Sequence, residues 1–253
     1  MRHAAIALLL FLAQATPAFE VMTIKANDGL SRGGRSGWEP GGRFQATNLP
    51  GNMLVQIAYG TPQRTLLGYQ LINIPAWLSN ARYDIVGKVR TDLALTDPSE
   101  LAAKGPQYLQ SLLAERFKLR VHHETRQLQR YRLVRAKGDR TLGPRLRETS
   151  CMPDVGKAAC NLQYGPNRYK FEGVTIARFA ADLSGNLSQV IADDTGLAGR
   201  YDLELDWSLD QNAADDKPSV FTAMQEQLGL KLIAERGPVD VVVIDHVEHP
   251  SED

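Results

Sequence analysis

The sequence predicts an α+β protein built from two tandem, diverged β-α-β-α-β-β modules. In this prediction each module is a two-layer sandwich of helices on a small mixed sheet. Two observations support it. Segments from the two halves of the chain match in five places in the same order, and strand-like pieces alternate with pieces of helical periodicity. A strand–helix unit of this size buries one sheet face under its helices, which gives two layers.

Residues 1–18 have the three parts of a secretory signal peptide. Arg2 and His3 give a cationic start, residues 4–13 form an apolar run of ten residues, and small residues follow. A transmembrane helix needs about 20 apolar residues, so this run is too short to span a membrane. We therefore expect an exported protein, periplasmic or secreted, with no membrane span after signal cleavage.

The first module is predicted over residues 19–136. Residues 19–26 alternate and are expected to form an edge strand, whereas residues 29–42, rich in Gly, Arg and Ser, are expected to be a mobile loop. The regular elements follow in this order: a strand at 43–46, a helix with Met53, Leu54, Ile57 and Ala58 at helical spacing, the strand Arg82-Tyr83-Asp84-Ile85, an amphipathic helix running into a strand over 109–121, and a strand at 131–136.

The second module is predicted over residues 168–250 and repeats this order. Its elements are a strand at 169–172, a helix with Ile176, Phe179, Ala180 and Leu183 on one face, the strand Arg200-Tyr201-Asp202-Leu203, a helix and strand over 221–233, and a strand at 239–247. Along the middle strand, apolar residues alternate with acidic ones. We therefore expect one buried face and one acidic, solvated face.

Residues 137–167 are predicted to link the modules and contain both cysteines, Cys151 and Cys160. An oxidising compartment favours a disulfide between them. Closing so short a loop contributes roughly 2–3 kcal/mol in the chain-entropy model. The alternative, a redox pair, prefers a Cys-x-x-Cys motif at the start of a helix.

Charge and motifs argue against several chemistries. Lys+Arg and Asp+Glu are equal at 29 each, so no basic excess points to nucleic acid. His246, Glu248 and His249 lack the helical spacing of a zinc-peptidase motif, and Ser184 is not in a Gly-x-Ser-x-Gly elbow. We expect no catalytic residue, no metal ligand and no cofactor.

Blocks in both halves resemble a soil-associated acidobacterial family of exported proteins of unknown function. The blocks are FEVMTIKA, PAWLSNARYDIVGKV, LLAERFKLRVHHETRQLQRYRLVRAKG, DDTGLAGRYDLELDW, FTAMQEQLGLKL and VVVIDHVEHPSED. A weaker resemblance, carried by Thr195–Leu197 and Leu228–Leu230, is to the short N-terminal module of secretins and TonB-dependent receptors. That resemblance implies protein partners in the periplasm, by analogy of fold alone.

We therefore expect a non-enzymatic binding or sensing module whose partner is an unknown envelope protein, recognised by strand addition, or a small ligand. The residues proposed for binding are the charged ones of the matching strands: Arg82, Asp84, Arg200, Asp202, Glu204 and Asp206. Two alternatives stay open. One is an extracellular hydrolase acting on cell-wall or plant polymers through the acidic stripe Asp202–Asp206. The other is a small-ligand sensor with its site in the cleft between the modules.

Overall fold

The structure is a computed structural model that describes residues 17–29, 33–61, 64–90, 98–138, 141–154, 159–165, 167–208 and 217–251. The predicted signal peptide lies almost wholly outside these residues. Within them, twelve strands form three four-stranded sheets, and none of the helices is long and apolar enough to cross a membrane. The predicted pair of two-layer α+β sandwiches is therefore wrong, because the protein is mostly β.

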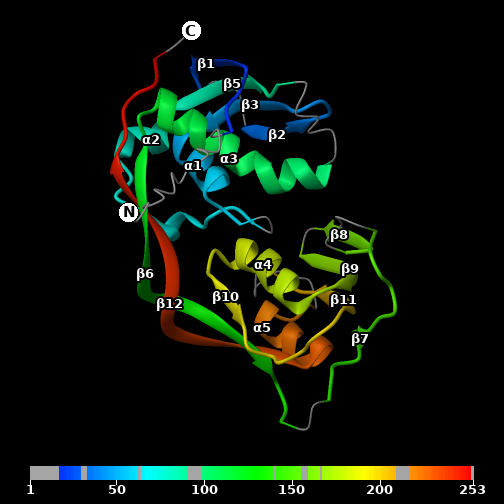
Figure 1. Ribbon diagram of the computed structural model, residues 1–253. Coiled ribbons are helices and arrows are strands. Elements are labelled where there is room, and N and C mark those ends of the chain that lie inside the picture. The colour runs from blue at the N-terminus through cyan, green and yellow to red at the C-terminus, as the bar shows by residue number, and fades with distance from the viewer. Residues whose placement is uncertain are drawn as a thin grey trace, which may run out of the picture.

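The first lobe is an antiparallel sheet with helices on its inner face (Figure 1). In spatial order its strands are β1 (Val21–Asn27), β5 (Arg82–Lys88), β3 (Arg43–Pro50) and β2 (Arg35–Glu39). Its helices are α1 (Gly51–Ala58), α2 (Ala76–Asn80) and α3 (Pro98–Arg116). The expected edge strand is confirmed as β1. The loop expected at 29–42 is wrong in part, because β2 pairs with β3 there and Trp38 lies opposite Phe44.

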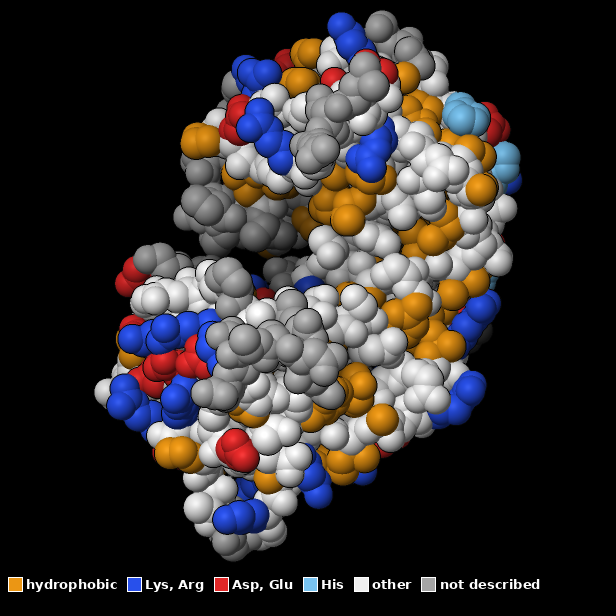
Figure 2. Space-filling view, turned by 180° about the vertical axis from the view of Figure 1, so that it is seen from behind, with side chains coloured by type: hydrophobic (Ala, Val, Ile, Leu, Met, Phe, Trp, Pro, Cys, Tyr) orange, Lys and Arg blue, Asp and Glu red, His pale blue; other side chains and the backbone are white. Residues whose placement is uncertain are grey.

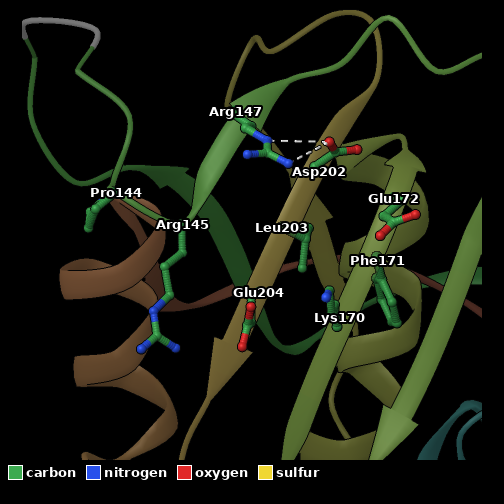
Figure 3. Close-up of a pocket in the computed structure, with 9 residues that line it drawn as sticks. All are labelled: Pro144, Arg145, Arg147, Lys170, Phe171, Glu172, Asp202, Leu203 and Glu204. Atoms are coloured by element: carbon green, nitrogen blue, oxygen red, sulfur yellow. Dashed lines mark hydrogen bonds and ion pairs between the residues drawn. The ribbon is translucent and has the colours of Figure 1, made fainter.

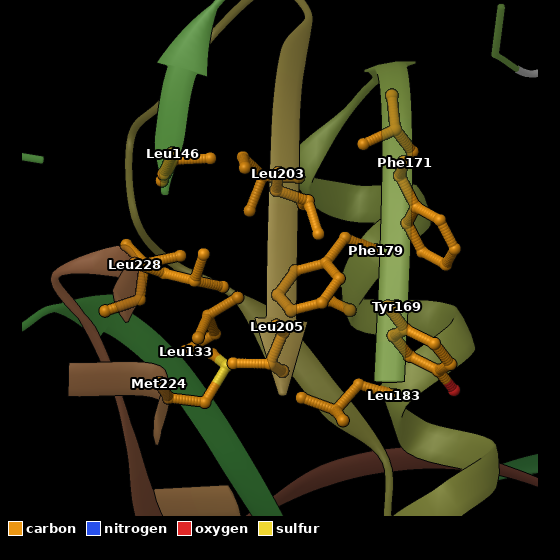
Figure 4. Close-up of a cluster of buried hydrophobic side chains, with 14 of the residues drawn as sticks. Leu133, Leu146, Tyr169, Phe171, Phe179, Leu183, Leu203, Leu205, Met224 and Leu228 are labelled. Carbon is orange, nitrogen blue, oxygen red and sulfur yellow. The ribbon is translucent and has the colours of Figure 1, made fainter. Parts of the chain in front are cut away.

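The second lobe is an antiparallel sheet of the order β7 (Leu146–Glu148), β11 (Tyr201–Asp206), β9 (Arg168–Val174) and β8 (Asn161–Gly165). Its helices are α4 (Ile176–Leu187) and α5 (Val220–Ala223), which continues as the π-helix η3 (Met224–Leu228). The apolar face of β11 is buried as expected, and Leu203 and Leu205 pack with Phe179 and Met224 in the core of this lobe (Figure 4). The segment predicted as a linker supplies β7 and β8.

A third, mixed sheet joins the lobes and explains why the fold prediction was wrong. Its order is β10 (Ile191–Asp193), β6 (Arg120–Arg135), β12 (Leu230–His246) and β4 (Leu71–Ile72). The two long strands pair antiparallel with each other over almost their whole length and form a spine along one side of both lobes (Figure 1). The short strand β10 pairs with β6, and β4, which follows a single 3₁₀ turn, η1 (Gly68–Gln70), pairs with β12. Each long strand thus pairs with a short parallel strand from the other half of the chain.

The two long strands are held together by side-chain contacts near the midpoint of the spine, where it bends between the lobes (Figure 1). Gly237 of β12 lies opposite Leu128 of β6. The side chain of Arg130 crosses Gly237, since a Cβ built there would lie 2.2 Å from its Nε. Arg130 donates hydrogen bonds to Glu235 on one side of this glycine and to the carbonyl of Pro238 on the other. Gly237 therefore leaves room for the Arg130 side chain, which acts as a clamp because it bonds β6 to two positions of β12.

Candidate functional site

The first Arg-Tyr-Asp motif holds a kink in a neighbouring strand. Asn48 of β3 has φ of 51°, and the register between β3 and β5 shifts between Ala46 and Leu49. Arg82 donates to the Asn48 carbonyl at 3.0 Å, and Asp84 accepts from the Asn48 backbone N–H at 2.8 Å. The motif thus satisfies both backbone groups of a residue that a regular ladder cannot pair.

The second motif does the same for Gly173 of β9, whose φ is 67°. Arg200 donates to the Gly173 carbonyl at 2.7 Å, and Asp202 accepts from its backbone N–H at 3.0 Å. The two motifs lie in different lobes, so the structure does not bring the four residues together in one site. Their contacts assign them to the support of bulged strands.

The predicted disulfide is confirmed, and it packs against the second kink. Cys151 and Cys160 are joined by a bond of 2.04 Å. Cys160 donates its backbone N–H to Glu172, and a Cβ added to Gly173 would lie 2.7 Å from the Cys160 Sγ. The bridge therefore joins the chain that follows β7 to the residue before β8, which is itself hydrogen-bonded to β9.

The acidic stripe of β11 lies on the outer face of the second lobe's sheet, where arginines neutralise it. Its ion pairs are Asp202 with Arg147, Glu204 with Arg168, and Asp206 with Arg145 and Arg168. Figure 3 shows this face, which is hollowed by a cavity of about 250 Å³. Alternating charges from neighbouring strands form cross-strand pairs of the kind that stabilise a sheet. The stripe is thus a paired surface, and its contacts do not mark it as a reaction centre.

The two lobes face each other across a larger cavity, of about 550 Å³. Figure 2 shows the molecule hollowed between its lobes on this side of the spine. The lining comes from the loop after α1, from the start of α4, and from residues at β10 and β11: Thr61, Arg64, Thr175, Ala177, Arg178, Ala181, Ile191 and Arg200. Three of these are arginines, and no carboxylate of the described residues lines the cavity.

Arg64 also lines a second cavity, of about 340 Å³, together with Thr61. Its guanidinium donates to Gln70 Oε1 at 2.9 Å and to the Thr65 carbonyl at 3.1 Å. Within the described part of the chain, no carboxylate is ion-paired with it. Burial lowers the pKa of Arg64, an effect that Tyr69 partly offsets. Arg64 is thus a partly buried cation without a counter-ion among the described residues.

Gln70 holds Arg64 in this position. Its side chain is 4% exposed, and its Oε1 accepts from the Leu67 N–H as well as from Arg64. Its Nε2 donates to the carbonyl of Asp240 in β12 at 2.8 Å. The buried amide therefore connects the guanidinium to the spine and fixes its orientation.

The opposite wall of the cavity is the first turn of α4. The Thr175 side chain caps the helix by accepting from the Arg178 N–H, and Arg178 is ion-paired with Asp182 at 2.9 Å. Burial raises the pKa of Asp182, although the arginine opposes this. The positive end of the helix dipole thus faces the cavity beside guanidinium groups.

Sequence reasoning proposed Arg200 for binding but missed Arg64 and Arg178. Arg64 lies in the segment between the matching blocks, three residues after Thr61, and this segment carries no periodicity. It is marked only by its hydrogen bond to Gln70, which is in turn bonded to Asp240 far along the chain. Arg178 lies on an amphipathic helix, where a charged residue is expected on the solvated face.

The histidines in the described part of the chain form no metal site. No group of three or more His, Cys, Asp or Glu in the described ranges is arranged to hold a metal ion. His122 lies on the exposed face of the spine between Glu124 and Asp245, at 2.9 and 2.8 Å. Hydrogen bonds to Glu124 and then Asp245 raise the pKa of His122 above 6.5.

Comparison with known proteins places the chain in a family without assigning it an activity. Neither the curated proteins nor the solved structures contain a match to this chain. A family model described as "Protein of unknown function (DUF3738)" matches residues 52–247. This span runs from α1 to beyond the end of β12 and includes both lobes' facing surfaces and the whole spine. The chain therefore belongs to the DUF3738 family.

Proposed function

We propose that this chain is an exported, non-enzymatic binding protein that holds a small anionic ligand in the cavity between its lobes. The observation that carries the proposal is Arg64, a partly buried guanidinium without a carboxylate partner in the described residues. An unpaired charge is costly to bury. A ligand anion offsets that cost and can accept two parallel hydrogen bonds from the guanidinium fork.

The surroundings of Arg64 support this assignment. The Thr61 and Thr175 hydroxyls can donate to an anion, and Arg178 and Arg200 lie on the facing wall. The cavity volume falls within the range of about 300–1,000 Å³ that is typical of small-ligand sites. A site between lobes is also a common place for such ligands, because groups from separate segments converge there.

Export is part of the proposal and rests on separate observations. Residues 1–18 have the pattern of a signal peptide, and the Cys151–Cys160 disulfide suits an oxidising compartment. Fractionation of the native host tests this point. We expect mature protein that begins near residue 19, in the periplasm or the medium, and full-length protein in the cytoplasm would contradict it.

Thermal unfolding at low ionic strength tests the binding site. A ligand that binds only the folded state raises the midpoint, and the increase grows with the logarithm of its concentration once that exceeds Kd. The probes are inorganic phosphate, sulfate, citrate and acetate, with glucose as the neutral control. We expect at least one anion to raise the midpoint, and titration calorimetry then gives its Kd.

Arg64→Gln is the decisive variant, since it removes the charge and keeps much of the side chain. Loss of a charge-assisted hydrogen bond of about 1.5–3 kcal/mol weakens binding by about 10- to 150-fold. Arg120→Gln is the matched control, because Arg120 is an exposed arginine at the start of β6, away from the cavity. If no anion binds, or if both variants bind as the unmodified protein does, the proposal is wrong.

A further inference from the structure

A fourth cavity, of about 640 Å³, lies in the first lobe between the edge strand β2 and helix α1, and we call it the β2–α1 groove. Most of its lining is apolar or glycine: Gly33, Gly34, Gly37, Trp38, Phe44, Leu49, Pro50, Met53 and Ile57, with Ser36, Thr65 and Arg82. Figure 2 shows hydrophobic side chains on the upper lobe at the rim of the hollow.

The apolar walls of this groove are held open by packing around Trp38. Its ring lies 5.3 Å from Phe44 and 5.8 Å from Phe19, and a Cβ on Gly105 of α3 would lie 2.7 Å from its Nε1. The indole is therefore fixed between the sheet and α3. Across the groove, Met53 of α1 is 38% exposed, although residues on the same helix are fully buried. A methionine here offers a soft, adaptable surface to an apolar group.

Two cations lie in the groove or next to it in the chain. Arg82 lies in the groove itself. Thr65, which also lines it, directly follows Arg64, and Arg64 donates to the Thr65 carbonyl. Two adjacent residues, Arg64 and Thr65, thus line the cationic cavity and the apolar groove respectively. No carboxylate of the described residues lines the groove.

We infer that the ligand is a small amphipathic anion, with its acidic group at Arg64 and an unbranched apolar chain in the β2–α1 groove. This inference rests on the proposed function and adds the ligand class. Charge complementarity sets the direction, because Arg64 directly precedes Thr65, which lines the groove. A purely polar anion would leave Trp38, Met53 and Ile57 in contact with water.

Straight-chain carboxylates from acetate to decanoate test the inference, with affinity measured by titration calorimetry below their micellar concentrations. Burial of each methylene is worth about 0.8 kcal/mol, so affinity is expected to rise by about three- to fourfold per added methylene until the groove is full. In Met53→Gln the gain per methylene should fall to about twofold or less.

Met152→Gln is the matched control, since Met152 is 79% exposed in the disulfide loop of the other lobe. In Met152→Gln the affinity should rise with chain length as it does in the unmodified protein. In Met53→Leu, which keeps an apolar side chain in the groove, this rise should also be kept. Affinity that is independent of chain length, or equal in Met53→Gln and Met152→Gln, overturns the amphipathic ligand and leaves anion binding at Arg64 intact. If no carboxylate, short or long, binds in a way that depends on Arg64, the proposed function is wrong as well.

Discussion

Asp84 accepts a hydrogen bond at 2.8 Å from the backbone N–H of Asn48, a residue in the left-handed conformation and 1% exposed. The carboxylate also accepts from the side-chain amide of Asn27 in β1. One acidic side chain therefore joins three strands of the first sheet at a kink. This contact is a structural role that can be measured separately from any ligand.

Replacing Asp84 by Ala should destabilise the first lobe. The Asn48 N–H is buried, and leaving it without an acceptor costs about 1–3 kcal/mol. Urea unfolding checks the value. Glu226→Ala is the control, because Glu226 is exposed on η3 and its loss should change stability by at most about 0.5 kcal/mol. Equal unfolding midpoints for the two variants would contradict the role of Asp84.

Two glycines should respond to alanine in opposite directions. Gly173 has φ of 67° and no room for a Cβ beside Cys160, so Gly173→Ala should destabilise by about 1–3 kcal/mol. Gly185 lies within α4 with open space around its Cα. Gly185→Ala should therefore stabilise by about 0.5–1 kcal/mol. Thermal unfolding of both variants measures these changes. A shift of the unfolding midpoint in the same direction in both would contradict the prediction.

Loss of the disulfide should weaken the protein modestly. The bridge spans a sequence separation of 9, and the chain-entropy model gives about 2–3 kcal/mol for such a loop. The cores of both lobes are built from other residues, so the double variant Cys151→Ser/Cys160→Ser should still unfold cooperatively. Chemical denaturation without reductant measures the loss. Complete unfolding of the variant in buffer would show that the sheet depends on the bridge.

His122 should make stability depend on pH. Its pKa in the folded protein is raised by Glu124 and Asp245, above an unfolded value of about 6.5. Its contribution is therefore fully present below pH of about 6.5 and is lost as the pH rises through the folded pKa. Titration of the ring by NMR checks the direction. His122→Asn should remove this part of the pH dependence, and a ring that titrates below 6.5 would disprove it.

Gly237→Ala should destabilise the spine by displacing Arg130. The added methyl would occupy the position of the guanidinium, and the ion pair with Glu235 is partly buried. We expect a loss of about 1–2 kcal/mol. A double-mutant cycle isolates the cause, because Gly237→Ala should cost little in an Arg130→Ala background. Strict additivity of the two changes would show that the clamp does not act as described.

The sequence predicted individual elements better than their arrangement. The helix carrying Phe179 and Leu183, the alternating strand at Tyr201–Asp206 and the disulfide all lie where expected, because period and cysteine spacing are local signals. The fold class was wrong because strand pairing is not local. Nothing in the apolar pattern of residues 120–135 and 230–246 shows that these strands pair with each other across both lobes.

The candidate site was predicted only in part, for the same reason. The charged residues of Arg82–Asp84 and Arg200–Asp202 stood out as matching motifs, but their partners are backbone groups at kinks that no pattern reveals. The cavity between the lobes depends on Arg64, which Gln70 holds in place, and Gln70 is bonded to Asp240 of β12 over a separation of 170 residues. Such a contact is visible only once the chain is folded.

The exchange of short strands in the third sheet has a consequence for how the chain reaches its native state. The edge that β4 needs is supplied by β12, which lies more than 150 residues later. As the chain is synthesised, β4 therefore stays unpaired until almost all the other elements have emerged. Such long-range pairing is expected to slow folding and to prolong exposure to aggregation. A fragment that ends after β6 should for this reason fail to form a stable lobe, since it would lack the partner of both β4 and β6.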